Sequence, residues 1–346
     1  MSGRSGTFYP VASLPDTNAR QPTMPVRPPS SSLLCIDSED RNQTYTVSRA
    51  AGSTPYAYDI TKTESIMNGF FTRIGVTEVV FPWVIPNINP KTVGINVTVT
   101  VGAGALVTRQ LVLNPSFLKP SDLATVIQAG IRALYSDTPS MAGFTMVYGN
   151  LPVQVGGNAG NNSNLPAFEY NTNAAGTLIA FTPLPYNTTA YPYPPNTKQL
   201  FDLLGFFLPE NSTLAQIGSG GLTYCAPIRY IDIVCNQLTY NQSLKDAMSQ
   251  QVVRDTLCRL YISTVGNQTT VSCGDATFCP PGCAPTTIYR DFASPKLIQW
   301  LPNQPVPGYL SFQVLDDTGA PLEESDPFSA TANKTDWSMT LQVTEN

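Results

Sequence analysis

The sequence predicts an all-β protein, a β-sandwich built from many short strands. Only 12% of the 346 residues are charged, and 31 Pro and 24 Gly residues cluster between short apolar runs. This composition is typical of strands joined by tight loops. Roughly ten runs alternate apolar and polar residues, as half-buried strands do, and only one long stretch has helical spacing.

The clearest pair of strands lies in residues 227–263. In its first half, Ile231 and Ile233 fall on one face and polar or aromatic residues fall on the other. The second half, Leu257–Ile262, repeats the alternation. The polar link between them, residues 241–254, predicts a short helix or a long loop that crosses from one sheet to another. Such crossings are part of Greek-key sandwiches.

The other elements follow in chain order. Further strands are predicted at 32–37, 56–60, 71–83, 95–101, 107–113, 177–182, 308–315 and 337–343. The fourth and fifth of these form a hairpin around Gly102 and Gly104. Residues 120–134 predict a helix that packs on the sheet, with Ser121 or Asp122 as its N-cap.

Composition also divides the chain into regions. Residues 1–30 contain six Pro and cannot build a core, so they form an extended arm. The arm is either a disordered tail or a segment that becomes ordered against a neighbouring subunit. Residues 31–346 form the sandwich domain. A Gly-, Asn- and Pro-rich insertion is predicted at about 149–195.

Charge and hydropathy exclude several kinds of partner. The net charge is −5 and the basic residues do not cluster, so a nucleic-acid groove is not expected. No apolar run reaches the roughly 18 residues that a transmembrane helix needs. Met1–Gly6 does not resemble a signal peptide, so we expect synthesis and folding in the cytosol.

The sequence predicts no catalytic residue and no bound cofactor. His is absent, which excludes Ser-His and Cys-His nucleophile pairs. Asp316-Asp317-Thr318-Gly319 contains the Asp-Thr-Gly of aspartic proteases. A second such loop, which would complete the carboxyl pair, is missing, so we predict an ordinary turn.

The seven cysteines are the remaining chemical groups of interest. Four of them are predicted to be small buried hydrophobic residues: Cys35, Cys225, Cys235 and Cys258. We predict no metal site, and Cys273, Cys279 and Cys283 are weak candidates for one. Their spacing is not C-x-x-C, and a fourth ligand is not evident, so free thiols or a disulfide compete with zinc.

Four segments, in this order, carry a resemblance to a known family. They are Asp37–Asn42, Arg73–Pro82 followed by Ile85–Asn89, Arg229–Thr239, and Ile298–Pro305 with the strand to Asp317. The chain resembles, from about Leu33 to Leu322, the penton and minor capsid proteins of virophages, polinton-like viruses and related double-stranded DNA viruses of eukaryotes. The insertion at 149–195 has no place in that family pattern.

The resemblance implies a single jelly roll of two four-stranded sheets. It implies a structural, non-enzymatic role as a homopentamer that closes the fivefold vertex of an icosahedral capsid. The implied neighbours are a major capsid protein with a double jelly roll and other minor capsid proteins. The implied location is the virion capsid, with synthesis in the host cytoplasm or virus factory.

Two other functions compete with the vertex protein. One is a minor capsid protein that cements major capsomers. The other is a jelly-roll module that binds a receptor or glycan, for which Tyr186, Tyr191 and Tyr193 form the only aromatic cluster.

Overall fold

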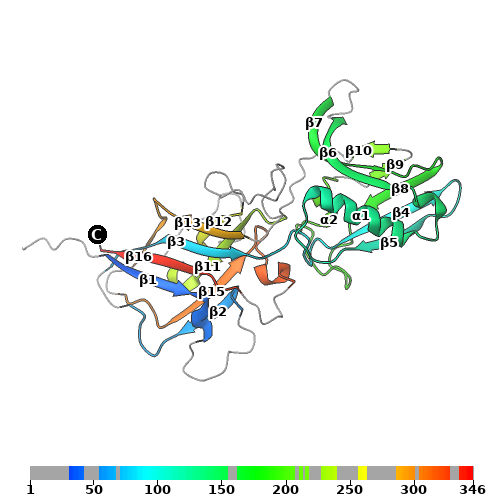
Figure 1. Ribbon diagram of the computed structural model, residues 1–346. Coiled ribbons are helices and arrows are strands. Elements are labelled where there is room, and N and C mark those ends of the chain that lie inside the picture. Colours follow the sequence, from blue (N-terminus) through cyan, green and yellow to red (C-terminus); the bar gives the residue numbers. More distant parts are fainter. Residues whose placement is uncertain are drawn as a thin grey trace, which may run out of the picture.

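The chain folds into two lobes that lie next to each other, each with its own hydrophobic core (Figure 1). The structure is a computed structural model. It describes residues 31–42, 54–67, 71–154, 162–206, 210–212, 215–217, 227–239, 256–262, 286–300, 304–327 and 335–345. The first lobe is a sandwich of two sheets. The second is inserted between two consecutive strands of that sandwich.

The sandwich is a jelly roll. Its first sheet has the order β1 (Ser31–Asp37), β16 (Ser338–Thr344), β3 (Arg73–Trp83) and β13 (Thr286–Asp291), and β14 (Leu297–Gln299) continues along β3. Its second sheet has the order β12 (Thr256–Tyr261), β11 (Tyr230–Val234), β15 (Tyr309–Leu315) and β2 (Ala57–Thr61).

The chain order of these strands defines the topology. The lobe has eight strands when β13 and β14 are counted as one. Numbered in chain order, the first sheet holds strands 1, 8, 3 and 6, and the second holds strands 5, 4, 7 and 2. All of the pairings are antiparallel. Eight antiparallel strands in two interleaved Greek keys make a jelly roll, so the predicted fold class is confirmed.

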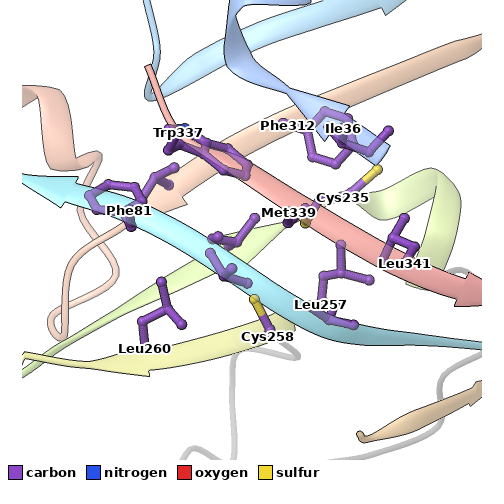
Figure 2. Packing of buried hydrophobic residues seen from close by; sticks show 14 of the residues in the cluster. Ile36, Phe81, Cys235, Leu257, Cys258, Leu260, Phe312, Trp337, Met339 and Leu341 are labelled. Atoms are coloured by element: carbon purple, nitrogen blue, oxygen red, sulfur yellow. The ribbon is translucent and has the colours of Figure 1, made fainter. Parts of the chain in front are cut away.

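Inward-facing residues of both sheets meet in one core, as period-2 alternation requires. Figure 2 shows Phe81, Leu260 and Phe312 from three strands packed with Trp337 and Met339. The Trp337 ring lies 6.1 Å from Phe81 and 6.4 Å from Phe312, and its Nε1 donates to Pro55 O at 2.6 Å. Burying this indole together with its hydrogen bond avoids an unsatisfied donor in the core.

The inserted lobe runs between β3 and β11. Its strands are β4 (Gly94–Val101), β5 (Val107–Val112), β6 (Thr145–Gln154), β7 (Asn162–Asn171), β8 (Thr177–Thr182), β9 (Glu210–Ser212) and β10 (Ala215–Ile217). They form two sheets, β5-β4-β8-β9 and β10-β7-β6. Helix α1 (Pro120–Leu134) contributes Leu123, Ile127 and Ile131 to the lobe's core.

Short helices complete the described elements. They are α2 (Leu200–Leu203), α3 (Asn236–Thr239), and the 3-10 turns η1 (Ser38–Asn42), η2 (Pro139–Met141) and η3 (Leu322–Ser325). Among the described helices, none is long and apolar enough to cross a membrane.

The predicted helix and the predicted hairpin are confirmed as α1 and as β4 with β5. The predicted N-cap is wrong by two or three residues. Lys119 occupies that position without a side-chain cap, and Pro120 is the first helical residue. Proline fits there because its missing N–H would have no partner in the first turn.

The predicted crossing between sheets is also wrong. Strands β11 and β12 are neighbours in one sheet, with Tyr230 opposite Tyr261. Alternation identifies which residues face a core, but it does not identify which strand lies alongside.

The inserted lobe is larger than the insertion predicted at 149–195, since its core extends from Ile88 to Phe206. Residues 1–30 lie outside the described part of the chain.

Candidate functional site

The predicted cysteine site cannot be placed, because Cys273, Cys279 and Cys283 lie outside the described residues, as does Cys225. Within the described ranges, no group of three metal-binding side chains occurs. Cys235 and Cys258 are buried as predicted. The prediction for Cys35 is wrong: it is exposed, because it lies on the outer side of edge strand β1.

The Asp316–Gly319 segment forms a tight turn at the junction between the two lobes. Asp316 Oδ1 accepts hydrogen bonds from Thr318 N at 2.9 Å, Thr318 Oγ1 at 2.6 Å and Ala320 N at 3.0 Å. Gly319 has φ +87°, a conformation that favours glycine. The segment is therefore a turn, as predicted. The other carboxylate oxygen of Asp316, Oδ2, faces the inserted lobe.

Lys91 of the inserted lobe forms an ion pair with Asp316 Oδ2. Its Nζ lies 2.9 Å from Asp316 Oδ2 and 3.4 Å from Glu324 Oε2. The Lys91 and Asp316 side chains are only 6% and 4% exposed. A buried ion pair gains little net stability, but losing one partner is costly, so this contact strongly favours one arrangement of the lobes.

A second ion pair lies beside the first. Asp317 Oδ2 is 3.0 Å from Arg229 Nε and 3.7 Å from Lys198 Nζ. Lys198 also donates to Pro227 O at 3.0 Å. Burial lowers the pKa of Lys198, and the neighbouring Asp317 carboxylate opposes that shift. Lys198 comes from the inserted lobe, while Asp317 belongs to the jelly roll.

The three tyrosines that were candidates for glycan binding pack at this junction. Tyr191 is buried, and its hydroxyl donates to Lys91 O at 2.8 Å. Its ring contacts those of Tyr186 and Tyr193 at 5.7 and 5.0 Å, and Lys91 Nζ lies 5.6 Å from the centre of the Tyr193 ring. Burial raises the pKa of Tyr191. The buried Tyr191 closes the joint, and Tyr186 and Tyr193 stay partly exposed beside it, so the three rings do not form a fully open aromatic platform.

The segment that enters the inserted lobe is held by its own amides. Asn87 accepts from Leu118 N at 2.9 Å and donates to Leu118 O at 2.8 Å. Asn89 Oδ1 accepts from Lys91 N at 2.9 Å, which orients the lysine toward Asp316. We call the set Asn89, Lys91, Tyr191, Lys198, Asp316 and Asp317 the lobe joint.

Other segments that carry the family resemblance also make structural contacts. Arg41, in η1, donates to Ser38 O and to Asp336 Oδ1, and its side chain is 2% exposed. Trp300 Nε1 donates to Gln304 O at 2.7 Å. The Arg41 contacts join η1 to the segment before β16, and the Trp300 bond holds a local turn, so these motifs contribute to folding.

One buried charge pair was not anticipated from the sequence. Asp232 of β11 is fully buried, and Arg259 of β12 binds it with two hydrogen bonds of 2.7 and 2.9 Å. The guanidinium also lies 3.9 Å from the centre of the Tyr230 ring. The pairing depends on the register of β11 with β12, which the sequence does not contain.

Among the described residues, the hydroxyl of Thr318 reaches the Asp316 carboxylate inside a turn that further hydrogen bonds hold closed. The carboxylates Asp316, Asp317 and Asp232 each face a cation, so they do not share a proton as a catalytic pair would. What the lobe joint provides is a fixed geometry between two folded units.

Comparison with known proteins finds solved structures at low identity. No family model matches the chain, and no curated protein matches it. The mavirus penton protein matches with a TM-score of 0.48 and 12% identity, over 92% of this chain and 99% of that one. A cryo-EM structure of the Sputnik virophage matches with a TM-score of 0.42 and 12% identity, over 92% of this chain and 98% of that one.

Proposed function

We propose that this chain is a structural capsid protein that forms the pentameric vertex capsomer of an icosahedral double-stranded DNA virus. The observation that carries the proposal is the complete jelly roll with a second lobe inserted between its third and fourth strands. Jelly rolls serve mainly as viral capsid domains, lectins and cupins. The residues of this chain distinguish among the three.

The side chains of this chain disfavour a cupin and a lectin. A metal-binding cupin needs ligands for which histidine is the commonest choice, and the chain has none. A lectin needs an open platform, and Tyr191 is 3% exposed with its hydroxyl already bonded to Lys91 O. A capsid role needs neither metal ligands nor an open aromatic platform. It also fits the sequence resemblance carried by residues in η1, β3 and β11.

Ring assembly also requires a subunit of fixed shape. Heterologous contacts close into a ring only when each subunit imposes the same rotation on the next. The buried Lys91–Asp316 pair and the neighbouring Lys198–Asp317 pair fix one lobe against the other. In this proposal the ring borders a major capsid protein with a double jelly roll and other minor capsid proteins within the virion.

The mass of the purified protein in solution tests the proposal. Light scattering should give about 187 kDa, five times the 37.4 kDa of one chain. Negative-stain images should then show fivefold rings. A stable trimer would contradict the vertex role. A stable monomer that binds glycans on an array would instead identify a binding module.

We also propose that residues 1–30 act as an arm between neighbouring subunits. Deletion of residues 2–30 should leave the melting temperature within a few degrees of the full chain, because β1 begins only at Ser31. The same deletion should weaken the assembly seen by light scattering. A deletion variant that fails to fold would contradict an arm role, and undiminished assembly would contradict a role in subunit contacts.

A further inference from the structure

In the sheet β5-β4-β8-β9 of the inserted lobe, strands β5, β4 and β8 have one face in the core and one face outward. Ile95, Val97 and Val99 of β4 are buried in the core. By alternation, the residues between them and their cross-strand partners point outward. We call this outward set the neutral face. It consists of Asn96, Thr98, Thr100, Thr108, Gln110, Val112, Leu178, Ala180 and Thr182.

The neutral face carries no charged side chain and no aromatic ring. Two apolar residues stand at its opposite ends, Val112 at 61% and Leu178 at 37% exposure. Thr108 and Gln110 are also exposed, and the remaining members are partly exposed. Solvated sheet faces are usually kept soluble by charged residues, which this one lacks.

The polar groups on this face are already partly satisfied within the chain. The hydroxyls of Thr98 and Thr108 face each other across the strands at 2.8 Å. Asn96 Nδ2 donates to Pro183 O at 3.5 Å. Covering Thr98, Thr108 and Asn96 leaves each of them a partner, which lowers the desolvation cost of burying this face.

The chemistry of the face narrows the choice of partner. Without Lys or Arg it cannot bind phosphate groups of nucleic acid or lipid headgroups. Without aromatic rings it lacks a stacking platform for sugar or base. Without charge it cannot select an oppositely charged peptide. What it fits is a neutral protein surface.

The net charge of −5 indicates which neutral protein surface binds this face. Copies of an acidic chain repel each other, and the repulsion is smallest where the facing surfaces carry no charge. We infer that the neutral face is a contact surface between copies of this chain. This inference rests on the proposed ring of identical subunits and names one of its contacts.

The area of the neutral face determines how much of the contact between two copies it can provide. Three strands about 4.8 Å apart, with a rise of about 3.3 Å per residue, give a surface of roughly 300 Å². A standard interface buries about 800 Å² per partner. The neutral face is therefore less than half of an interface, and it acts together with other contacts in the ring.

The double variant Thr98→Lys/Thr108→Lys tests the inference. It places two positive charges at the centre of the face, and burying them should weaken self-association at least tenfold. Sedimentation velocity across a wide concentration series measures this for the full chain. The matched control is Thr125→Lys/Ala133→Lys, which adds the same charge at exposed positions of α1. The control should associate like the wild type, and all three proteins should have similar melting temperatures.

The outcomes separate this inference from the proposed function. A pentamer that forms equally well in the wild type and the face variant overturns the inference and leaves the vertex role intact. Association that the face variant abolishes, but that stops at dimers or trimers, supports the inference and contradicts the vertex role. A wild type that is monomeric throughout the concentration series overturns the inference.

Discussion

Three cysteines in the described part of the chain differ in exposure, and this determines their reactivity. Cys35 is exposed on β1, whereas Cys235 and Cys258 are buried. Burial raises the pKa of the Cys235 thiol to about 11 and that of Cys258 to about 12. Only the thiolate is nucleophilic, so burial and the raised pKa both make Cys235 and Cys258 unreactive.

We therefore expect iodoacetamide at mildly alkaline pH to alkylate Cys35 and to spare Cys235 and Cys258. Peptide mass spectrometry reads each site separately, so the other cysteines do not interfere. The same reaction in denaturant should alkylate all three and serves as the control. Rapid native alkylation of Cys258 would contradict its burial.

The same pKa shifts predict a loss of stability at high pH. The Cys258 thiol has a folded-state pKa of about 12, against an ordinary value of 9.0. The contribution of this buried thiol to the free energy of unfolding is fully present below pH 9. It falls as the pH rises from 9 toward 12, because the unfolded chain loses its proton first.

Between pH 8 and about pH 10.5, the free energy of unfolding should fall by roughly 2 kcal/mol more in the wild type than in Cys258→Ala. Urea denaturation at the two pH values measures this difference. Equal losses in the two proteins would mean that Cys258 is not the group responsible.

Among the structural elements, the lobe joint is the contact whose loss should matter most. Lys91→Met leaves Asp316 buried without its cation, which should cost about 3–5 kcal/mol in the free energy of unfolding. The matched control is Lys198→Met. Lys198 is 35% exposed and 3.7 Å from Asp317, which keeps Arg229, so this change should cost less than about 1 kcal/mol.

Urea unfolding of the two variants compares these costs directly. The double variant Lys91→Met/Asp316→Asn should recover part of the loss, because it removes the unpaired charge. Equal costs for Lys91→Met and Lys198→Met would show that the buried pair does not hold the lobes together.

For the whole molecule, two separate cores imply two folding units. The jelly-roll core draws its buried residues from Ile36–Ile85 and Ile228–Val343, and the inserted lobe adds only partly buried Phe117 to it. Replacing residues 93–226 with a short Gly-Ser linker should therefore leave a folded jelly roll.

Circular dichroism and a cooperative urea transition would verify that this shortened chain is folded. Loss of cooperative unfolding would show that the jelly roll depends on the inserted lobe. Assembly of the shortened chain should also be weaker than that of the full chain, because the neutral face has been removed with the lobe.

The local features of this protein could be predicted from the sequence. Alternation identified the strands and the core face of Ile231 and Ile233, and spacing identified α1. These signals are local because a strand or helix repeats within a few residues. The absence of histidine likewise excluded Ser-His and Cys-His nucleophile pairs before any fold was known.

The non-local features were decided only by the tertiary structure. The pairing of β11 with β12, the second core and the contact between Lys91 and Asp316, 225 residues apart, have no local signature. Strands 95–101 and 107–113 read like jelly-roll strands, so the size of the inserted lobe was underestimated. Which surfaces meet depends on register and on the path of the whole chain, whereas periodicity reports only which residues avoid water.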